Sequence, residues 1–443
     1  PSGVALAVSF EFMMRPPRRL KTLCRNLLAR WGATLAARNA YERDALLLAQ
    51  YIDCSTEALR QAQQHPERVN PDIRKRVCHW YLPPFENAFY GGIMTVLRLA
   101  AHLRERHGVR QRFLICGSCD PVSLSEKIGS AFGALREAEV IALNSPEKID
   151  SIPPADYSVA TLWTTAYTLL QIRNTGYKFY MIQDYEPLFY PAGSTYAQAE
   201  LTYRFGFYGI TNTHSLYDIY TTEYGGTAVA LTPAVDTTLF NPSGRTAGTT
   251  RKRVFYYARP GTPRNGFELA VAALRRLKDR YGDGVDIVAA GADWKPEEYG
   301  LQNVIRVLGT LPYEDTPSLY RSCHVGFVMM MTKHPSYLPF ELMACGCLVV
   351  SNFNPANTWF LKNGKNCLLA PPTTTALYET LARALDRYEE LTAVRRAGTD
   401  EVLTRYGDWE ASLMRVARFM HAPHLARPSS HEAHQHEPVQ QIR

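Results

Sequence analysis

The chain has 443 residues, of which 46% are hydrophobic and 21% charged, a composition that excludes a disordered protein and suits two or three globular domains. Its apolar runs are shorter than the roughly 18 residues of a membrane span, and the first run precedes its basic residues, the reverse of a secretory signal. Residues 1–112 contain 18 Lys/Arg and 9 Asp/Glu, a net charge of +9 in a chain of net charge +7. This basic first quarter suits an anionic partner (phosphorylated lipid, membrane surface or nucleic acid) or serves as a solubilising surface.

Residues 18–64 repeat apolar side chains at three-to-four spacing with Arg and Lys between them, which predicts helices. The segment HPERVNP at 65–71 ends this pattern. Residues 1–76 are therefore predicted to form a helical extension that docks on the main fold, on a membrane surface or on a neighbouring domain. Because the chain starts without Met, we expect either a segment of a longer polypeptide or a trimmed chain.

From residue 77 the pattern changes to short apolar strands alternating with helices, first over 77–245 and then, after the polar linker 241–253, over 246–400. This alternation is typical of parallel sheets covered on both faces. The predicted strands are 112–116, 157–163, 178–183 and 209–213 in the first set, and 254–259, 286–291, 304–309, 325–331, 347–352 and 366–371 in the second.

The predicted fold class is therefore α/β, with two doubly wound, Rossmann-like domains that face a cleft, where a ligand binds at the carboxyl ends of the strands. Residues 401–427 are predicted to form a C-terminal helix, mainly 401–420, that packs back on the first domain. Residues 428–443 are predicted to be a disordered tail. Histidines from 421 to 436 are of the ligand type that binds metals, but nothing in the pattern fixes their geometry.

The nine cysteines form no disulfide-like framework, which indicates a reducing cytoplasm. The sequence CGSC at 116–119 matches a redox or metal motif, yet it has no second pair nearby. A turn of small residues after a strand is the favoured interpretation.

Gly91 and Gly92 open a predicted helix, where free backbone N–H groups and the helix dipole can face an anion or a sugar. The alternative is a tight start of a helix. After the strand at 254–259, Arg259, Arg264 and Asn265 converge on the beginning of another helix. Guanidinium groups match phosphate oxygens, so this loop is predicted to hold a diphosphate, the alternative being solvated surface arginines.

His334, Pro335, Ser336 and Tyr337 form a predicted strand-to-helix turn whose backbone amides point into the cleft. Glu341 falls in the first turn of the helix that follows. A carboxylate there can accept paired hydrogen bonds from the vicinal hydroxyls of a ribose, or it can cap the amides of its own helix.

Asp184 and Glu186 follow a predicted buried strand, in QDYEP, and should face the cleft. Asp184 is predicted to position or deprotonate an acceptor hydroxyl, or to stabilise an oxocarbenium-like transition state. Glu186 joins it in the catalytic pair, as a structural or acceptor-binding neighbour. Their acid–x–acid spacing also occurs in metal sites, which need a different fold, so no metal is expected; a solvated loop is the remaining alternative.

Together these segments resemble the C-terminal domain of GT-B glycosyltransferases of the retaining family 4. LTPAVDTTLFNP (231–242) is similar to that family's "gvD…F.P" segment, VFYYARPGTPRNGFELAVAAL (254–274) to its donor-phosphate segment, and FELMACGCLVVSN (340–352) to its "lEAma.G.pVv" segment. VLGTLPYEDTPSLYRSCHVGFVMM (307–330) is similar to the stretch where backbone, here near Gly309 and Leu311, meets the base, and KNGKNCLLAPP (362–372) to its "dG.nGllv.p" segment. The resemblance covers roughly 78–420 and implies a nucleotide-sugar substrate in the second domain, an acceptor glycan in the first, and no cofactor.

Within this class, WTTAYTLLQ (163–171), YMIQDYEPLFYPAGSTYAQAELTY (180–203) and HPSYLPFELMACG (334–346) resemble bacterial rhamnosyltransferases that build S-layer and O-antigen glycans. The resemblance implies transfer of L-rhamnose from dTDP-L-rhamnose, with retention, in the cytoplasm or at the inner face of the cell membrane. Trp163 and Tyr190 join Gly91 and Gly92 as predicted acceptor or sugar contacts.

Family 4 usually has two glutamates separated by seven residues. Glu341 matches the second, but the first position is Lys333, which cannot accept hydrogen bonds from sugar hydroxyls. Lys333 can pair with a phosphate or with Asp184, so we place it among the donor-binding residues.

The expected partners are a nucleotide-sugar donor and a lipid-linked or polysaccharide acceptor, without nucleic acid. Membrane contact through the basic N-terminal region and neighbouring domains of a longer polypeptide are further expectations. Three alternatives stay open: a transferase that uses a GDP- or UDP-hexose, a GT-B nucleotide-sugar epimerase, and a non-catalytic module of a larger polysaccharide synthase.

Overall fold

The computed structural model describes residues 43–64, 76–89, 91–248 and 251–426. They belong to two units, one ending at Asp53 and one beginning at Cys54. In the predicted helical extension, residues 43–51 are helical and α2 (Thr56–Ala62) begins the second unit. Predictions for the chain before residue 43, for 65–75 and for the tail 428–443 lie outside the described residues.

Helix α2 lies on the main fold. It contacts α6 (Trp163–Gln171), and Gln63, directly after α2, donates a hydrogen bond of 3.1 Å from Nε2 to the backbone oxygen of Arg204. Ser55 caps the helix by accepting a 3.1 Å hydrogen bond from the backbone N–H of Ala58. This part of the extension is therefore attached to the first sheet's helices.

The first sheet has seven parallel strands in the order β3-β2-β1-β4-β5-β6-β7. The four strands predicted for this half are confirmed, and three others were not predicted. The strands are β1 (Val77–Leu82), β2 (Arg110–Ile115), β3 (Glu139–Ala142), β4 (Ala155–Ala160), β5 (Thr175–Ile182), β6 (Tyr208–Asn212) and β7 (Ala228–Leu231).

The second sheet has six parallel strands in the order β10-β9-β8-β11-β12-β13, and the six predicted strands are all confirmed. Both sheets are doubly wound and Rossmann-like, as predicted. The strands are β8 (Lys252–Tyr257), β9 (Val285–Ala290), β10 (Arg306–Val307), β11 (Val325–Val328), β12 (Leu348–Asn352) and β13 (Leu368–Ala370).

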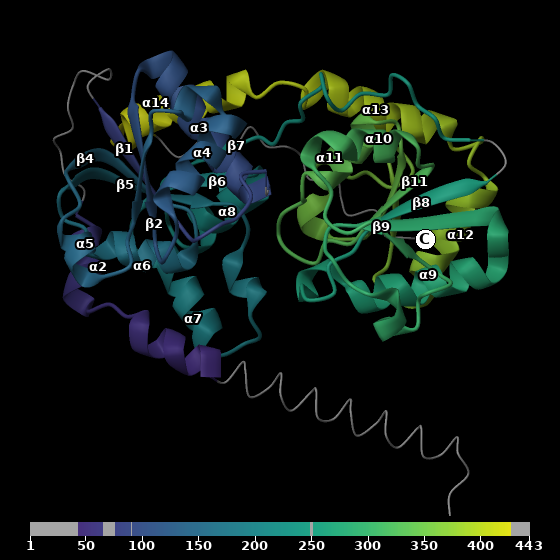
Figure 1. The fold of residues 1–443 in the computed structure, drawn as a ribbon, viewed down its shortest axis with the longest axis horizontal. Coiled ribbons are helices and arrows are strands. Elements are labelled where there is room, and N and C mark those ends of the chain that lie inside the picture. The colour runs from purple at the N-terminus through teal and green to yellow at the C-terminus, as the bar shows by residue number, and fades with distance from the viewer. Residues whose placement is uncertain (1–42, 65–75, 90, 249–250, 427–443) are drawn as a thin grey trace, which may run out of the picture. The chain divides into compact units, whose positions relative to one another are not determined.

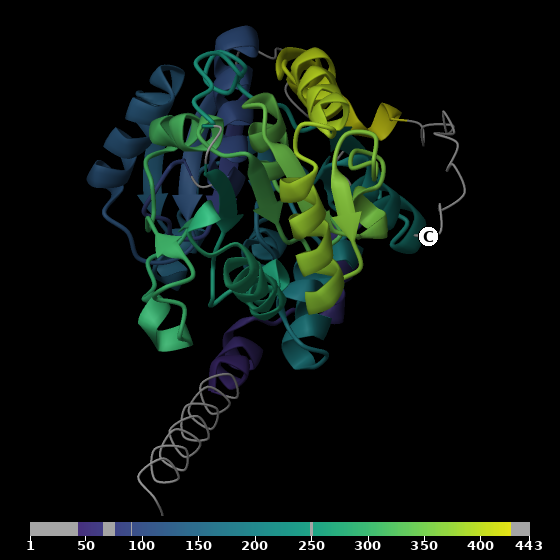
Figure 2. The same cartoon turned by 90° about the vertical axis from the view of Figure 1, so that its right-hand side faces the viewer.

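Helices cover both faces of each sheet (Figure 1, Figure 2). Their apolar sides pack on strands that are buried on both faces, which is why the strands read as continuous apolar runs. Besides α2 and α6, the helices are α3 (Gly91–His107), α4 (Pro121–Ala131), α5 (Pro146–Asp150), α7 (Ser194–Leu201), α8 (His214–Asp218), α9 (Phe267–Tyr281), α10 (Thr316–Arg321), α11 (Leu338–Ala344), α12 (Thr374–Asp386), α13 (Thr392–Arg405) and α14 (Glu410–His421).

The predicted single helix over 401–420 is wrong, because α13 ends at Arg405 and α14 begins at Glu410. The backbone N–H of Glu410 donates a 2.7 Å hydrogen bond to Asp408 Oδ1, which starts the new helix. Helix α13 contacts α11 of the second sheet, whereas α14 contacts α3 and β7 of the first (Figure 1). The chain therefore returns to the first sheet in the short segment between them.

Candidate active site

Most of the predicted site residues lie in or directly after the loops that follow the carboxyl ends of β5, β8 and β11. The others follow β1 (Gly91 and Gly92), β4 (Trp163) and β10 (Gly309 and Leu311). Two of these loops meet: the turn Glu186–Phe189 contacts the turn Pro263–Asn265. There the guanidinium carbon of Arg264 lies 4.3 Å from the ring centroid of Phe189. The structure thus brings a predicted donor-phosphate loop against the loop that carries the predicted acids.

Asp184 lies close to Arg264 at this meeting point. Its Oδ1 accepts a 2.8 Å hydrogen bond from the backbone N–H of Tyr185. Burial raises the pKa of Asp184 to about 6, although the Tyr185 hydrogen bond, the charge of Arg264 and a hydrogen bond with Thr332 all act to lower it. Asp184 is therefore mostly a carboxylate at neutral pH and has a pKa that suits a general base.

Glu186 is 2% exposed, and its carboxyl group lies against Trp163, at the start of α6, and Tyr180, in β5. Its Oε2 accepts hydrogen bonds from the backbone N–H of Trp163 (2.6 Å) and from the hydroxyl of Tyr180 (2.9 Å). Burial raises the pKa of Glu186 to about 8. The placement of Glu186 in the catalytic pair is therefore corrected. It is a positioning residue, because both hydrogen bonds that its carboxyl group accepts come from groups of the protein.

Trp163 is also buried, at 1% exposure, so its ring does not offer a face to a sugar and the predicted direct contact is corrected. Trp163 contacts the loop after β5 through Tyr190. Trp163 Nε1 donates a 3.0 Å hydrogen bond to Tyr190 Oη, and the two rings pack edge to face with 5.8 Å between their centroids. Tyr190 is half-buried and stays in the candidate site.

Gly91 and Gly92 form the first turn of α3 and are both exposed. A Cβ atom on Gly92 would lie 3.4 Å from Gln183 Oε1, so the turn and this carboxamide are in close contact. Gln183 Oε1 is buried and has no hydrogen-bond partner within the described part of the chain. An acceptor atom without a donor at the start of a helix is an unusual feature that a ligand hydroxyl could satisfy.

The loop after β8 is held close to the residues that follow β11. The backbone N–H of Met331 donates a 3.0 Å hydrogen bond to the backbone oxygen of Arg264. Gly266 has φ +53°, a left-handed conformation that favours glycine, and it lies close to the side chain of Met331. Of the other predicted phosphate contacts, Asn265 is half-buried and Arg259 is exposed.

The turn from His334 to Tyr337 leads into α11, as predicted. Two residues that sequence reasoning missed fix the chain before it. Asn354 Nδ2 donates a 2.6 Å hydrogen bond to the backbone oxygen of Thr332, and Asn352 Oδ1 accepts one of 2.7 Å from the backbone N–H of Met330. Asn352 is the last residue of β12, and Asn354 follows it. In the sequence, the only indication of this role is a pair of Asn residues at the end of an apolar strand. Lys333, Pro335 and Ser336 lie in this turn, with Lys333 exposed.

Glu341 is half-buried in the first turn of α11. No side-chain hydrogen bond caps this helix, so the alternative in which Glu341 satisfies its own helix amides is not seen. Burial raises the pKa of Glu341 to about 8. The carboxyl group is consequently available to hydroxyls of a ligand.

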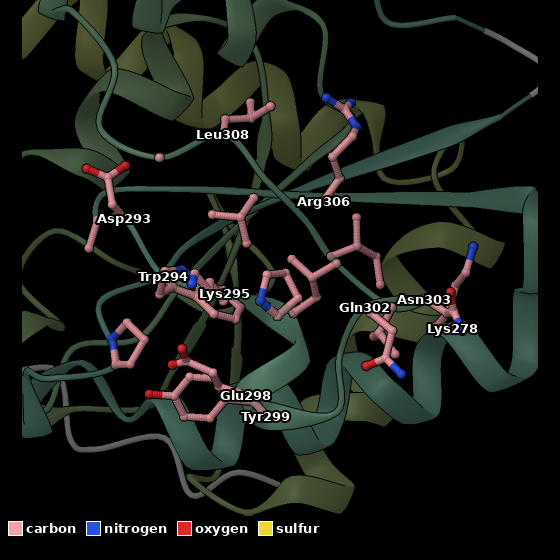
Figure 3. A pocket seen from close by; sticks show the side chains of 18 of the residues that line it. Lys278, Asp293, Trp294, Lys295, Glu298, Tyr299, Gln302, Asn303, Arg306 and Leu308 are labelled. Carbon is pink, nitrogen blue, oxygen red and sulfur yellow. The ribbon is translucent and has the colours of Figure 1, made fainter.

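A groove of about 1230 Å³ runs along the edge of the second sheet, beside β9 and β10. Figure 3 shows Asp293 and Leu308 toward one end, and Lys278 and Asn303 toward the other. Gly309 lines the first end, with φ +70°, and Asp293 Oδ1 accepts a 3.1 Å hydrogen bond from the N–H of the next residue, Thr310. Leu311, whose backbone is also predicted to lie near the base, packs its half-buried side chain on the core.

Within residues 43–64, 76–89, 91–248 and 251–426 there is no group of three or more His, Cys, Asp or Glu that could hold a metal. Cys116 and Cys119 are free thiols, and burial raises the pKa of the Cys116 thiol to about 12. In the same part of the chain, the helices are too short or too polar to cross a membrane.

Comparison with known proteins gives two family matches. The model of the WsaF N-terminal domain matches residues 85–214, and that of the WsaF C-terminal domain matches residues 252–382. The O-antigen biosynthesis protein RfbC of Myxococcus xanthus is 43% identical over 353 residues, which is 78% of this chain. The chain spans only 27% of that relative's length.

Among solved structures, HepE of Anabaena in complex with UDP-glucose has a TM-score of 0.61 and 14% identity, covering 78% of this chain and 99% of that one. The sucrose-phosphate synthase of Thermosynechococcus elongatus has a TM-score of 0.59 and 13% identity, covering 78% and 98%. With two Rossmann-like sheets of seven and six strands, the chain has the GT-B glycosyltransferase fold.

Proposed function

We propose that this chain, which is similar to both WsaF domains and has the GT-B fold, is a glycosyltransferase in bacterial surface polysaccharide synthesis. L-Rhamnose from dTDP-L-rhamnose is our first choice of donor, because the segments at 180–203 and 334–346 resemble rhamnosyltransferases. The observation that carries the proposal is the contact between the loops of the two sheets, where the Arg264 guanidinium lies 4.3 Å from the Phe189 ring centroid and its charge acts on Asp184 in the same loop.

In this proposal the donor diphosphate binds Arg259, Arg264 and the turn at 334–337, with Lys333 beside it. These cations offset the charge that builds on the diphosphate as it leaves, which is a role that a metal has in other transferases. Glu341 binds the ribose hydroxyls, and the base lies near Gly309, at the end of the groove.

Asp184 acts on the acceptor. Burial in the cleft gives it a pKa of about 6, so it can take the proton of an acceptor hydroxyl as the new glycosidic bond forms. Glu186 and Trp163 hold the loop of Asp184 and Tyr190 in place. Retention, which the resemblance implies, is read from the anomeric configuration of the product by NMR.

The first test measures thermal shifts of the purified protein with dTDP-, UDP- and GDP-sugars, followed by transfer assays with the donor that stabilises it. We expect dTDP-L-rhamnose to give the largest shift; UDP-glucose is the informative comparison because HepE binds it. Asp184→Asn should keep donor binding and lose transfer. No shift with any of the donors would contradict the transferase assignment, and undiminished turnover of Asp184→Asn would contradict the role of Asp184.

A further inference from the structure

We propose that Tyr337 is a positioning residue that couples the donor-phosphate turn to the acceptor side of the first sheet. The inference rests on the proposed function for the ligand of that turn. Tyr337 was predicted to contact the nucleotide-sugar donor. We change this role because its hydroxyl group forms hydrogen bonds with residues of the first sheet's half of the protein.

The hydroxyl of Tyr337 lies between α3 and β6. Tyr337 Oη is 2.9 Å from Thr95 Oγ1 and 3.3 Å from Asn212 Nδ2. Thr95 Oγ1 uses its own proton in a 2.7 Å hydrogen bond to the backbone oxygen of Gly91. The Tyr337 hydroxyl therefore donates a hydrogen bond to Thr95 Oγ1 and accepts one from Asn212 Nδ2. Each proton in this series of hydrogen bonds then has an acceptor.

The ring of Tyr337 reinforces the connection. A Cβ atom on Gly91 would lie 3.5 Å from Tyr337 Cδ2, so the ring packs against the first turn of α3. Its other neighbour is Trp409, at 5.8 Å between ring centroids, in the segment where the chain returns to the first sheet. The ring of His334, in the same turn, also lies near the backbone of Asn212.

The residue after Asn212 is held in a strained conformation. Thr213 has φ +123°, which a β-branched residue rarely adopts, and its buried hydroxyl has no partner within the described residues. Such strain persists only where the surroundings enforce it, and it concentrates at functional sites. The Tyr337 hydroxyl contacts the side chain of Asn212, the residue directly before Thr213.

A ligand that moves or stiffens the turn at 334–337 consequently acts on Asn212 in β6 and on Gly91, which is a predicted acceptor or sugar contact. Tyr337→Phe removes only the hydroxyl and keeps the ring packing. The matched control is Tyr281→Phe, because the Tyr281 hydroxyl bonds to Asp386 Oδ1 (2.6 Å), between two helices of the second sheet.

The test is hydrogen–deuterium exchange of the full chain with and without dTDP, read at peptides covering 91–95, 208–214 and 333–341. In the wild type and in Tyr281→Phe, dTDP should slow exchange at all three, by about fivefold or more in the two peptides of the first sheet. In Tyr337→Phe, protection should persist at 333–341 and be lost at 91–95. Thr95→Val should likewise keep protection at 333–341 and lose it at 91–95. If Tyr337→Phe does not fold, Thr95→Val is used as the test variant.

Unchanged protection of 91–95 in both variants would overturn the coupling while leaving the donor site intact. Absence of protection at 333–341 in the wild type with dTDP, UDP and GDP would overturn the donor site itself, and the coupling with it. The two failures are distinguished by the peptide at 333–341.

Discussion

Binding of the donor should release about 0.9 proton at pH 7, and Glu341 should be its source, because burial gives this carboxyl group a pKa of about 8. At pH 7 it is therefore mostly protonated in the free protein. Ribose hydroxyls that donate hydrogen bonds stabilise the carboxylate and lower its pKa in the complex. At pH 9 the group is already ionised, so the release should fall to about 0.1 proton.

Isothermal titration calorimetry measures this proton count as the dependence of the binding enthalpy on the ionisation enthalpy of the buffer. The ligand should be the nucleotide sugar, because its diphosphate carries two ester bonds and has no titration near pH 7. Glu341→Gln should bind about 10–100-fold more weakly, the loss of charged hydrogen bonds worth about 1.5–3 kcal/mol, and should release no proton. Proton release that is unchanged in Glu341→Gln, or absent from the wild type at pH 7, would refute the ribose assignment.

Three further predictions concern the other charged groups. The kcat/KM profile should rise with a slope of one up to about pH 6, as Asp184 loses its proton, and a profile that is flat from pH 5 to 8 would exclude it as the base. Because burial raises the pKa of Glu186 from 4.5 to about 8, the native state binds more protons in that window and stability falls as pH rises through it. Glu186→Gln should remove this contribution and keep activity, whereas Glu186→Ala leaves two buried donors unpaired and should cost about 2–4 kcal/mol in urea unfolding; loss of activity without loss of stability in Glu186→Gln would restore a catalytic role. Lys333→Glu should weaken donor binding about tenfold or more in calorimetry, since a carboxylate beside the diphosphate replaces attraction with repulsion, while Lys333→Arg should stay within a few-fold of the wild type.

The apolar strands could be predicted from the sequence because both faces of a parallel sheet are covered, so their side chains form continuous runs. Three strands of the first sheet escaped for different reasons. β3 and β7 are edge strands of four residues, but length alone does not explain the miss, since the shorter edge strands β10 and β13 were predicted. β1 is central but contains a buried polar residue, His79, whose Nε2 lies 2.7 Å from Arg112 Nη1 on the neighbouring strand. A pairing between strands cannot be read from one strand alone.

The candidate site was predictable to the level of loops, since polar residues directly after apolar strands must lie at the carboxyl edge of a sheet. It was not predictable to the level of side-chain direction. Asp184 and Glu186 are two residues apart, yet one lies beside Arg264 and the other is buried under Trp163, because a tight turn begins between them. Tyr337 is a similar case, since its partners on α3 and β6 are distant in the sequence.

The protonation states are compatible with the proposal that a site with several acids binds an anionic donor. Glu341, with a pKa of about 8, is largely uncharged at pH 7, which leaves Asp184 as the anion beside Arg264. With Arg259 and Lys333 in the same loops, the donor-free cleft has a cationic balance that favours a diphosphate. A glutamate at position 333 would remove much of that balance, so the lysine there is consistent with a site in which phosphate binding depends on side chains. In the proposed complex, loss of a proton from Glu341 adds a negative charge only where the ribose hydroxyls are present to satisfy it.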